Sequence, residues 1–371
     1  MKNPKKTVYL NFCLIALLVA FTGLACKQSP SKLWPTSGHA DKTAQAFRHW
    51  DNATNPDATV AAGCASCHSP EGFQQYIADT TYNRTVADPP LATADIGITC
   101  EACHSDSKKG ILRTPPVAGQ VHFTASGLDA TGVGTSAVIC GQCHQGRTYE
   151  GTVDAAIAKS ATPDQMDTIS SKISITNFSP HYRSAFAEIR ASVSKIGYTY
   201  GNPALHVDST HAGGTDCMFC HNQHSSAIDV GRNGKNCQPC HKYTTVADVL
   251  ALNTAIPGLE DQLLTVIQAY AKATQSNNPL LGNITKDQAC IAYDDTAYPY
   301  WFNDSNCDGT ADGTAGANWY TSFTPRLAKA CYNYVVSKKD PGGFAHNGGY
   351  ISAILGASIV NLRVFDPNLG K

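Results

Sequence analysis

Five copies of one short cysteine pattern constrain this chain more than any other feature. Each copy has two cysteines separated by two residues, and a histidine directly follows the second cysteine in all five. The copies are Cys64-Ala-Ser-Cys67-His68, Cys100-Glu-Ala-Cys103-His104, Cys140-Gly-Gln-Cys143-His144, Cys217-Met-Phe-Cys220-His221 and Cys237-Gln-Pro-Cys240-His241. A pattern that recurs in this form indicates one kind of site built five times.

The C-x-x-C-H pattern is the attachment motif of covalently bound c-type haem. Two thiols three positions apart reach the two vinyl groups of one porphyrin and form thioethers, and the imidazole that follows binds the iron. Zinc ribbons, thioredoxin-like redox pairs and disulfide frameworks also use paired cysteines, but none of them requires the histidine. The sequence therefore predicts five haems c.

The second axial ligand of each iron decides whether a haem only relays electrons or also binds a substrate. Methionine is scarce: Met218 lies inside an attachment motif, Met1 belongs to the N-terminal segment, and only Met166 remains. Because methionine ligation raises the reduction potential, its scarcity favours bis-histidine haems of low potential.

Eight histidines lie outside the attachment motifs and are the candidates for the second axial position. They are His39, His49, His122, His181, His206, His211, His224 and His346. A lone histidine is usually a surface residue or a satisfied polar residue. In a chain with five predicted irons we expect most of them to be ligands, with His122 and His211 the weaker candidates. His224, three residues after His221, would reach an adjacent haem if that turn is helical.

The N-terminus predicts export. Lys2, Lys5 and Lys6 precede an uncharged, mostly apolar run from Thr7 to Ala25, as in a secretory signal of residues 1–26. An uncleaved membrane anchor is the alternative, although the run is short for a span. Cys26 lies where a bacterial lipoprotein is cleaved and acylated, with Gly23 in place of the usual leucine. We expect the periplasm, outer membrane or cell surface, with a possible lipid anchor.

Composition limits the fold. The 371 residues include 30 glycines and 19 prolines, and the apolar fraction of 42% is spread through short runs, which predicts a thin conventional core. The net charge of −1 gives no indication of nucleic acid as a partner. We therefore expect a mainly α fold with much irregular loop and little sheet, organised around five covalent haems.

The chain divides into three predicted parts: the signal of residues 1–26, a five-haem block over 27–245, and a helical, haem-free C-terminal segment over 246–371. The amphipathic stretch from Val246 to about Ala273 is expected to pack on the haem block. The other expected helices are Gly38 to Trp50, Val153 to Ala158, Pro180 to Ser194, Arg326 to Val336 and His346 to Leu362.

An aspartate-rich loop between Tyr298 and Tyr320 has the oxygen spacing of a calcium loop. Asp304, Asn306, Asp308 and Asp312 occupy positions 1, 3, 5 and 9, and glycine occupies position 6. Position 12 is alanine, so the usual bidentate glutamate is missing. The loop therefore predicts either a structural calcium site or a plain turn rich in Asx residues.

Three cysteines, Cys290, Cys307 and Cys331, belong to no attachment motif and do not follow the signal. In an oxidising compartment one pair could form a disulfide, and Cys290 with Cys307 closes the shorter loop. The third thiol would then be buried in the helix around Cys331.

Several strings resemble the multihaem, here pentahaem, c-type cytochromes of metal-reducing and related anaerobic bacteria. They are Ser37-Gly-His39-Ala with Phe47-Arg-His49-Trp50, Cys143-His-Gln-Gly-Arg147, Cys220-His-Asn-Gln-His224, Tyr298-Pro-Tyr-Trp-Phe, Thr324-Pro-Arg326, Tyr332-Asn-Tyr334 and Lys339-Asp-Pro-Gly-Gly-Phe-Ala-His346-Asn. The resemblance implies respiratory electron transfer, often toward extracellular acceptors. It makes six histidines the stronger distal candidates: His39, His49, His181, His206, His224 and His346.

Three hypotheses about function follow. The first is an electron carrier that exchanges electrons with other cytochromes or quinol-linked donors and is not itself an enzyme. The second is a reductase of nitrite or hydroxylamine with one open iron, which the histidine in all five motifs disfavours. The third is a subunit of a conduit in an outer-membrane β-barrel, or of a self-associated cytochrome filament.

Overall fold

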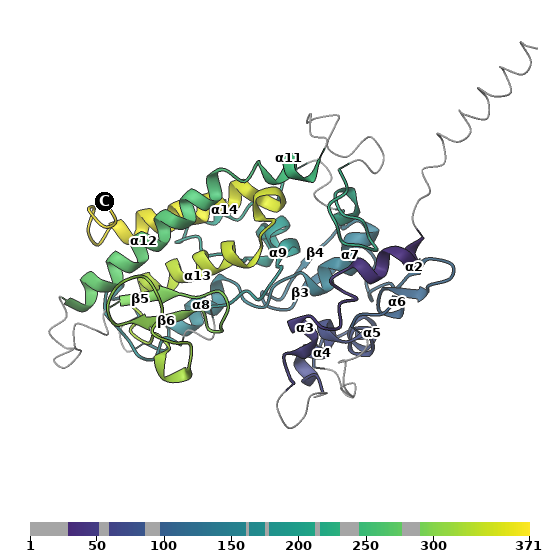
Figure 1. The fold of residues 1–371 in the computed structure, drawn as a ribbon, viewed down its shortest axis with the longest axis horizontal. Coiled ribbons are helices and arrows are strands. Elements are labelled where there is room, and N and C mark those ends of the chain that lie inside the picture. Colours follow the sequence, from purple (N-terminus) through teal and green to yellow (C-terminus); the bar gives the residue numbers. More distant parts are fainter. Residues whose placement is uncertain are drawn as a thin grey trace, which may run out of the picture.

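The computed structural model describes residues 29–51, 59–85, 97–160, 163–174, 178–211, 216–230, 245–276 and 290–371. The predicted signal, Cys26 and the fifth attachment motif lie outside these ranges. Short helices gather at one end of the molecule and long helices at the other (Figure 1). Among the described residues, no helix is both long enough and apolar enough to cross a bilayer.

The part that contains the described attachment motifs consists of short helices joined by irregular chain. Its α-helices are α2 (Pro30–Leu33), α3 (Gln45–Arg48), α4 (Ala62–His68), α5 (Pro70–Ala78), α6 (Cys100–Cys103), α7 (Thr135–Cys143), α8 (Glu150–Ile157), α9 (Ala185–Ile189) and α10 (Ala191–Ser194). Three 3-10 turns accompany them: η1 (Trp34–Thr36), η3 (Pro203–Leu205) and η4 (Cys217–Phe219).

Long helices form the C-terminal part. They are α12 (Ala255–Ser276), α13 (Pro325–Lys339) and α14 (Gly343–Arg363), preceded by the short α11 (Val246–Leu250) and accompanied by η7 (Gly316–Asn318). Helix α13 begins with a capping threonine, because Thr324 Oγ1 accepts from the Leu327 N–H at 3.1 Å. Pro325 in the first turn is preset for a helix.

Sheet is limited to three antiparallel ribbons of two strands each in the described ranges. They pair β1 (His104–Asp106) with β2 (Ile111–Leu112), β3 (Val121–Phe123) with β4 (Leu128–Ala130), and β5 (Cys290–Tyr293) with β6 (Trp301–Asp304). The fold is thus mainly helical and irregular, as the sequence predicts. Strand β6 lies inside the segment expected to be loop.

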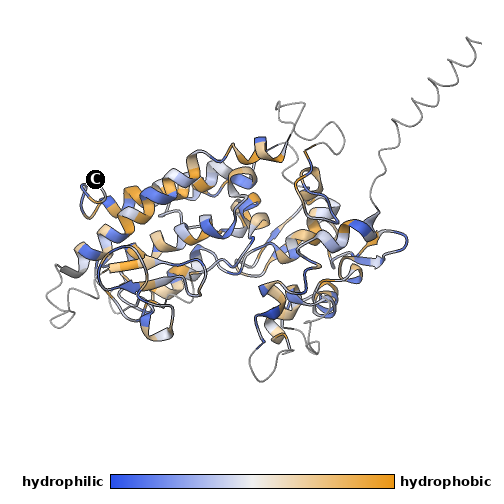
Figure 2. Ribbon diagram, viewed as in Figure 1, coloured by the Kyte–Doolittle hydropathy of each residue, from blue (hydrophilic) through white to orange (hydrophobic). Residues whose placement is uncertain are grey.

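The two parts differ in their cores. Helix α12 buries Leu263, Val266, Ile267 and Tyr270 at helical spacing and packs on α13, α14 and β5. Orange and blue residues alternate along α12 and α14 in Figure 2, as expected for helices with one buried face. Most contacts of this stretch are thus with the C-terminal part, although it shares one core with residues of the 27–245 block and Tyr270 donates to Asp167. The prediction of a thin core is wrong in this part.

The large core continues from the C-terminal helices into α7, α8, α9 and α10. Around α3, α5 and α6 there is a separate and much smaller cluster that Cys103 and Cys143 join from the edge; it is Phe47, Phe73, Tyr76, Ile77, Ile98, Ala102 and Ile139. A prosthetic group with a large apolar surface would supply the burial that this small cluster lacks.

Two helix predictions are wrong in their extent. Only Gln45–Arg48 is α-helical within 38–50, because Asp41 and Ser37 bind nearby backbone N–H groups and hold turns. Between 180 and 194 the helix begins only at Ala185, since His181 and Arg183 adopt positive φ angles of 74° and 57°. Helices α8, α13 and α14 confirm the other predicted positions.

The disulfide prediction is confirmed. Cys290 and Cys307 are bonded at an S–S distance of 2.05 Å, and this bond connects β5 to the loop after β6. Cys331 is fully buried in α13, as expected for the leftover thiol.

Candidate haem-binding sites

Each of the four described attachment motifs forms a helical turn. Helix α4 contains the first motif and ends at His68, α6 contains the second, and α7 ends with the two cysteines of the third. The fourth begins in η4. Residues three apart lie on the same side of a helical turn, so the two thiols of each motif face the same way.

Each described attachment histidine faces one second histidine from outside the motifs. The ring centroids are 5.8 Å apart for His68 and His181, 6.4 Å for His104 and His224, 6.1 Å for His144 and His39, and 6.3 Å for His221 and His346. The Nε2 atoms of His68 and His181 are 3.5 Å apart.

These separations suit an iron between two imidazoles. A metal bound at about 2 Å by each of two opposed imidazoles holds the two nitrogens about 4 Å apart and the ring centroids roughly 6 Å apart. Two rings in ordinary offset stacking would have closer centroids than these. Rings in edge-to-face contact, however, have centroid distances in the same range, so the distance alone does not identify an iron site. The repeated pairing of one motif histidine with one outside histidine is therefore the informative observation.

The other ring nitrogen of several of these histidines is held by an oxygen. His144 Nδ1 lies 2.8 Å from the Arg183 carbonyl, and His221 Nδ1 lies 3.1 Å from the Ser226 carbonyl. A carbonyl can only accept, so Nδ1 carries the hydrogen and Nε2 is left with its lone pair. This is the tautomer and the fixed orientation that a metal-binding histidine needs.

His346 has the strongest partner of this kind. Its Nδ1 is 2.5 Å from Oδ2 of Asp340, which is 5% exposed. Burial alone would lower the pKa of His346, but the hydrogen bond and the charge of Asp340 raise it. Beside them, burial and the charge of Asp340 raise the pKa of Glu188 well above its usual value. Against the effect of burial, the hydrogen bond and charge of His346 lower the pKa of Asp340, so of the two carboxyl groups Asp340 is the one that favours the negative charge.

Two of the outside histidines have pKa values well below the usual value. Burial, followed by the charge of His144, lowers the pKa of His39 to about 4. Burial, followed by the charge of His68, lowers the pKa of His181 to about 3. Because a metal binds the neutral imidazole, both residues are in the binding form at neutral pH.

His104 lacks such a partner among the described residues. Its Nδ1 is buried and makes no hydrogen bond there. An unpartnered buried nitrogen usually costs about 1–3 kcal/mol, so its presence needs an explanation.

The motifs also lie close to one another. The side chains of Cys143 and Cys67 interact, so the third motif touches the first. One turn earlier in α7, the side chain of Cys140 interacts with Cys217 of the fourth motif. Helix α7 thus lies between the first and fourth motifs.

Four outside histidines do not face a described attachment histidine. His206 is buried against Tyr350, with Nδ1 3.6 Å from Glu150 Oε1, and His122 binds Asp129 at 2.7 Å. His49, whose Nδ1 is 2.9 Å from Gln45, and His211 are both exposed. The candidacy of His49 and His206 remains a prediction, because the fifth motif lies outside the described ranges.

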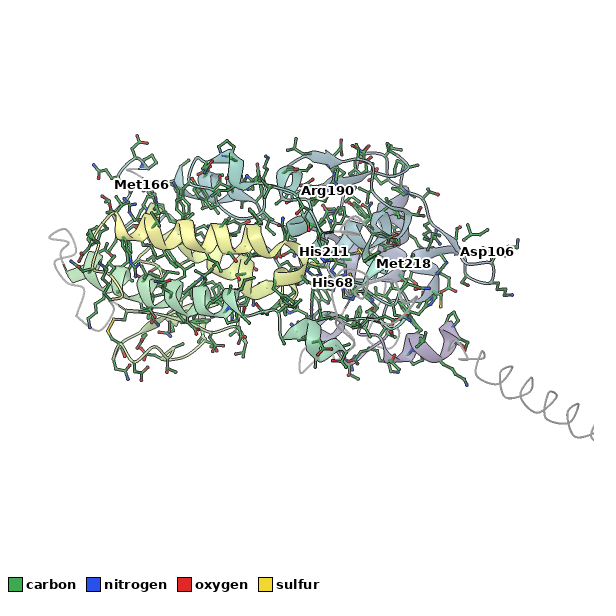
Figure 3. The ribbon with its side chains drawn as sticks, turned by 90° about the horizontal axis from the view of Figure 1, so that it is seen from above. His68, Asp106, Met166, Arg190, His211 and Met218 are labelled. Atoms are coloured by element: carbon green, nitrogen blue, oxygen red, sulfur yellow. A yellow bond between two sulfur atoms is a disulfide. The ribbon has the colours of Figure 1, made fainter. Side chains whose placement is uncertain are left out.

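Neither remaining methionine is placed as an alternative ligand. Met166 lies at the end of the molecule far from His68 and Met218 in Figure 3. Met218 is exposed within the fourth motif itself. The described residues thus offer histidine, and not methionine, opposite each described attachment histidine.

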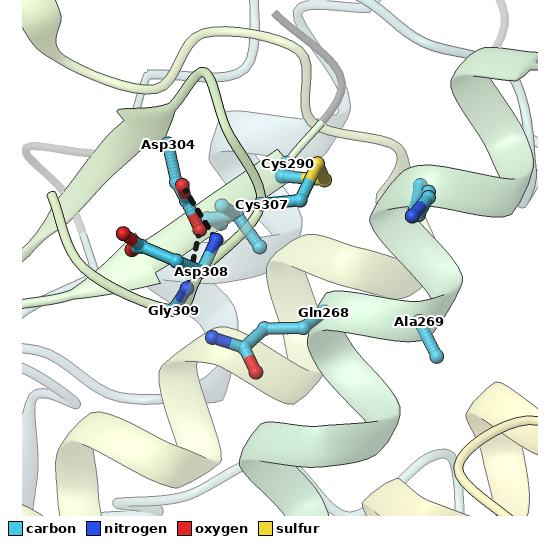
Figure 4. Close-up of a pocket in the computed structure, with 9 residues that line it drawn as sticks. Gln268, Ala269, Cys290, Asp304, Cys307, Asp308 and Gly309 are labelled. Atoms are coloured by element: carbon cyan, nitrogen blue, oxygen red, sulfur yellow. Dashed lines mark hydrogen bonds between the residues drawn. A yellow bond between two sulfur atoms is a disulfide. The ribbon is translucent and has the colours of Figure 1, made fainter. Parts of the chain in front are cut away.

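The aspartate-rich loop encloses a pocket beside the disulfide (Figure 4). Asp304, 1% exposed, accepts from the N–H groups of Asp308 at 3.2 Å and Gly309 at 2.8 Å. Asp312 accepts from the Ser305 N–H at 2.9 Å. These bonds are those of an Asx-rich turn and do not distinguish it from a calcium loop, so calcium stays a prediction.

The sequence did not single out Asp340, Ser226 or Arg183 as partners of the candidate ligands. For Asp340 a signal existed, since it lies six residues before His346 ahead of a Pro-Gly-Gly turn. Ser226 and Arg183 act through backbone carbonyls in part, which no residue pattern reveals.

Comparison with curated proteins finds distant relatives. The c-type polyheme cytochrome OmcB of Geobacter sulfurreducens is 24% identical over 382 residues, which cover 86% of this chain and 46% of OmcB. OmcC of the same organism is 24% identical over 387 residues, covering 87% and 45%. The chain thus spans about half the length of the curated relatives it matches.

No protein-family model matches the chain. No solved structure matches it either. The distant similarity is thus to polyheme c-type cytochromes, in agreement with the attachment motifs of this chain.

Proposed function

We propose that the chain carries five haems c, each bound by two histidines, and acts as an electron carrier rather than an enzyme. Haem iron, when bound, supplies a one-electron couple. The observation that carries the proposal is the repeated pairing: every described attachment histidine has one outside histidine at a centroid distance near 6 Å.

The proposed ligand pairs, each an attachment histidine followed by its distal partner, are His68 with His181, His104 with His224, His144 with His39, and His221 with His346. The fifth, His241, would take its partner from His49, His122, His206 or His211. The protein's role at each site is to hold two neutral imidazoles in line and to fix their orientation through Nδ1. With both axial positions filled by protein, no substrate site remains at the four described motifs.

Redox-titrated absorption spectroscopy with a pyridine haemochrome count tests this function. We expect five haems per chain, all low-spin, with low reduction potentials because methionine is absent from the axial positions. A high-spin haem in the purified protein, together with turnover of nitrite or hydroxylamine by reduced protein, would favour the reductase instead.

Asp340 is expected to lower the potential of the fourth haem. A carboxylate that accepts from Nδ1 makes His346 a more basic ligand, which stabilises the oxidised iron. For Asp340→Asn we expect that potential to rise by on the order of 50 mV, since a tenfold change in a one-electron equilibrium is about 59 mV.

Asp167→Asn is the matched control for that experiment. Asp167 is ion-paired with Arg326 at 2.7 Å, so the variant removes the same charge from a position that the structure pairs with arginine and tyrosine. Spectroelectrochemical titration of both variants should show a shift in Asp340→Asn alone. Equal shifts in the two variants would mean that only net charge matters.

We further propose that the protein is exported to the periplasm, the outer membrane or the cell surface, and that acylation of Cys26 anchors it to a membrane. Its redox partners would be other cytochromes or quinol-linked donors, and an outer-membrane β-barrel or a second copy of the chain would be its assembly partner in the alternative interpretation. Several acyl chains anchor a protein firmly, whereas the polypeptide without them is released.

Cys26→Ser is therefore expected to move most of the protein from the membrane fraction to the soluble exported fraction while leaving its haem content unchanged. Fractionation followed by haem staining measures both. Cys331→Ser is a suitable control, because it also removes one unpaired thiol. Membrane retention of Cys26→Ser would rule out the lipid anchor.

A further inference from the structure

Ser226 contacts two of the histidine pairs at once. Its backbone carbonyl accepts from His221 Nδ1 at 3.1 Å, and its hydroxyl lies 3.2 Å from His39 Nδ1. His221 is the attachment histidine of the fourth motif, whereas His39 faces His144 of the third. One residue thus binds the Nδ1 side of rings that belong to two different sites.

The backbone conformation of Ser226 makes both contacts possible. Its φ is +59°, a left-handed value that side chains other than glycine seldom adopt. The turn that contains it is closed by hydrogen bonds from Ser226 N to the Asn222 carbonyl at 2.8 Å and from Asn222 N to the Ala227 carbonyl at 2.9 Å. Such a conformation persists where surrounding structure enforces it, often at functional sites.

A second serine completes the arrangement. Ser37 Oγ, in a residue that is 2% exposed, lies 3.0 Å from Ser226 Oγ and accepts from the His39 N–H at 3.2 Å. With Nε2 of His39 free for a metal, its Nδ1–H donates to Ser226, and the Ser226 hydroxyl donates in turn to Ser37. The hydrogens of His39 Nδ1 and of the Ser226 hydroxyl then both have acceptors, which favours one orientation of the His39 ring.

We propose that Ser226 is a positioning residue shared by the third and fourth haems, an inference that rests on the proposed bis-histidine ligation. Its hydroxyl sets the plane of His39, the distal ligand of the third haem, and its carbonyl sets the plane of His221 on the fourth. The two functions use different groups of one residue, so they can be separated by mutation.

Ser226→Gly separates them. Glycine adopts a positive φ readily and keeps the carbonyl, so only the hydroxyl is lost. We expect altered low-spin g-values and a shifted midpoint potential for the third haem, with the fourth unchanged. The third haem's signals are identified in the full-length protein by His39→Ala, which should make that haem alone high-spin.

Ser225→Gly is the matched control, because its hydroxyl accepts from the Ala227 N–H at 3.4 Å and is not part of this chain. Ser37→Ala removes the acceptor of the Ser226 hydroxyl and should shift the same haem, although Ser37 Oγ also lies 3.4 Å from His39 Nδ1, so Ser226→Gly is the decisive variant. If either test variant retains five haems and all g-values and potentials match the wild type, the inference is overturned.

The same measurements distinguish failure of this inference from failure of the proposed function. If the wild-type protein shows no low-spin bis-histidine signals, the proposed ligation itself is wrong. The shared role of Ser226 is supported if the wild-type protein shows those signals and only the third haem changes in the Ser226→Gly variant.

Discussion

Replacing His181 with glycine is expected to turn one low-spin haem into a high-spin haem. His181 faces His68 with an Nε2–Nε2 distance of 3.5 Å, and among the described residues it is the histidine paired with the first motif. Its φ of +74° suits glycine, so the substitution removes the ring with little backbone strain. Loss of an axial ligand should shift the potential of that haem by on the order of 100 mV, given that axial ligands set haem potentials over about 0.8 V.

Electron paramagnetic resonance of the oxidised protein measures this change. Added imidazole should enter the space left by the ring and restore the low-spin signal. Tyr182→Phe is the matched control: it alters the neighbouring residue, whose hydroxyl is 2.9 Å from that of Tyr300, and it leaves the proposed ligand in place. A His181→Gly protein that keeps five low-spin haems would show that another residue binds the first iron.

Removal of the third attachment site is expected to make the protein lose more than one haem. Helix α7 is buried over most of its length and touches the first and fourth motifs through Cys143 and Cys140. A void of about 400 Å³, roughly the size of a porphyrin, would cost on the order of 10 kcal/mol if it stayed open. That approaches the whole stability of a typical domain.

The variant Cys140→Ser/Cys143→Ser should therefore contain fewer than four haems and lose its resistance to protease. Cys100→Ser/Cys103→Ser is the matched control, because Cys100 is exposed and α6 buries only Ala102. It should lose one haem and keep the rest. Intact-mass spectrometry counts the haems in both variants. Equal losses in the two variants would show that α7 does not support the neighbouring haem sites more than α6 does.

The sequence predicts the chemistry of the sites better than their arrangement. The five motifs define the cysteines and the proximal histidines because thioether attachment fixes their spacing. The distal partners cannot be deduced in this way. His181 is 113 residues from His68, and His39 is brought to His144 by turns that the expected helix over 38–50 would not have made.

The C-terminal segment shows the same limit. Its helices follow from apolar periodicity and from capping at Thr324, and the closing helices lie where the pattern predicts them. What the pattern does not reveal is that α14 has a kink at Asn347, whose amide donates to the carbonyls of Glu188 and Val207. This kink follows His346 directly and sets it opposite His221.

Polar partners of the histidine rings are the third kind of feature that sequence patterns miss. The buried Asp340 contacts Nδ1 of His346 and the exposed Ser226 contacts Nδ1 of His39, yet neither residue type is unusual at its position. Their roles become visible only through distances: 2.5 Å from Asp340 to His346 and 3.2 Å from Ser226 to His39.

Intact-mass spectrometry of the exported protein, combined with its low-temperature spin-state spectrum, measures covalent haem attachment and axial ligation together. Five covalent bis-histidine haems predict a polypeptide heavier by five haems that resist extraction by acidified solvent, and a spectrum with low-spin iron only. A mass equal to that of the bare polypeptide, or cysteines that react freely with a thiol reagent in the five motifs, would contradict this prediction.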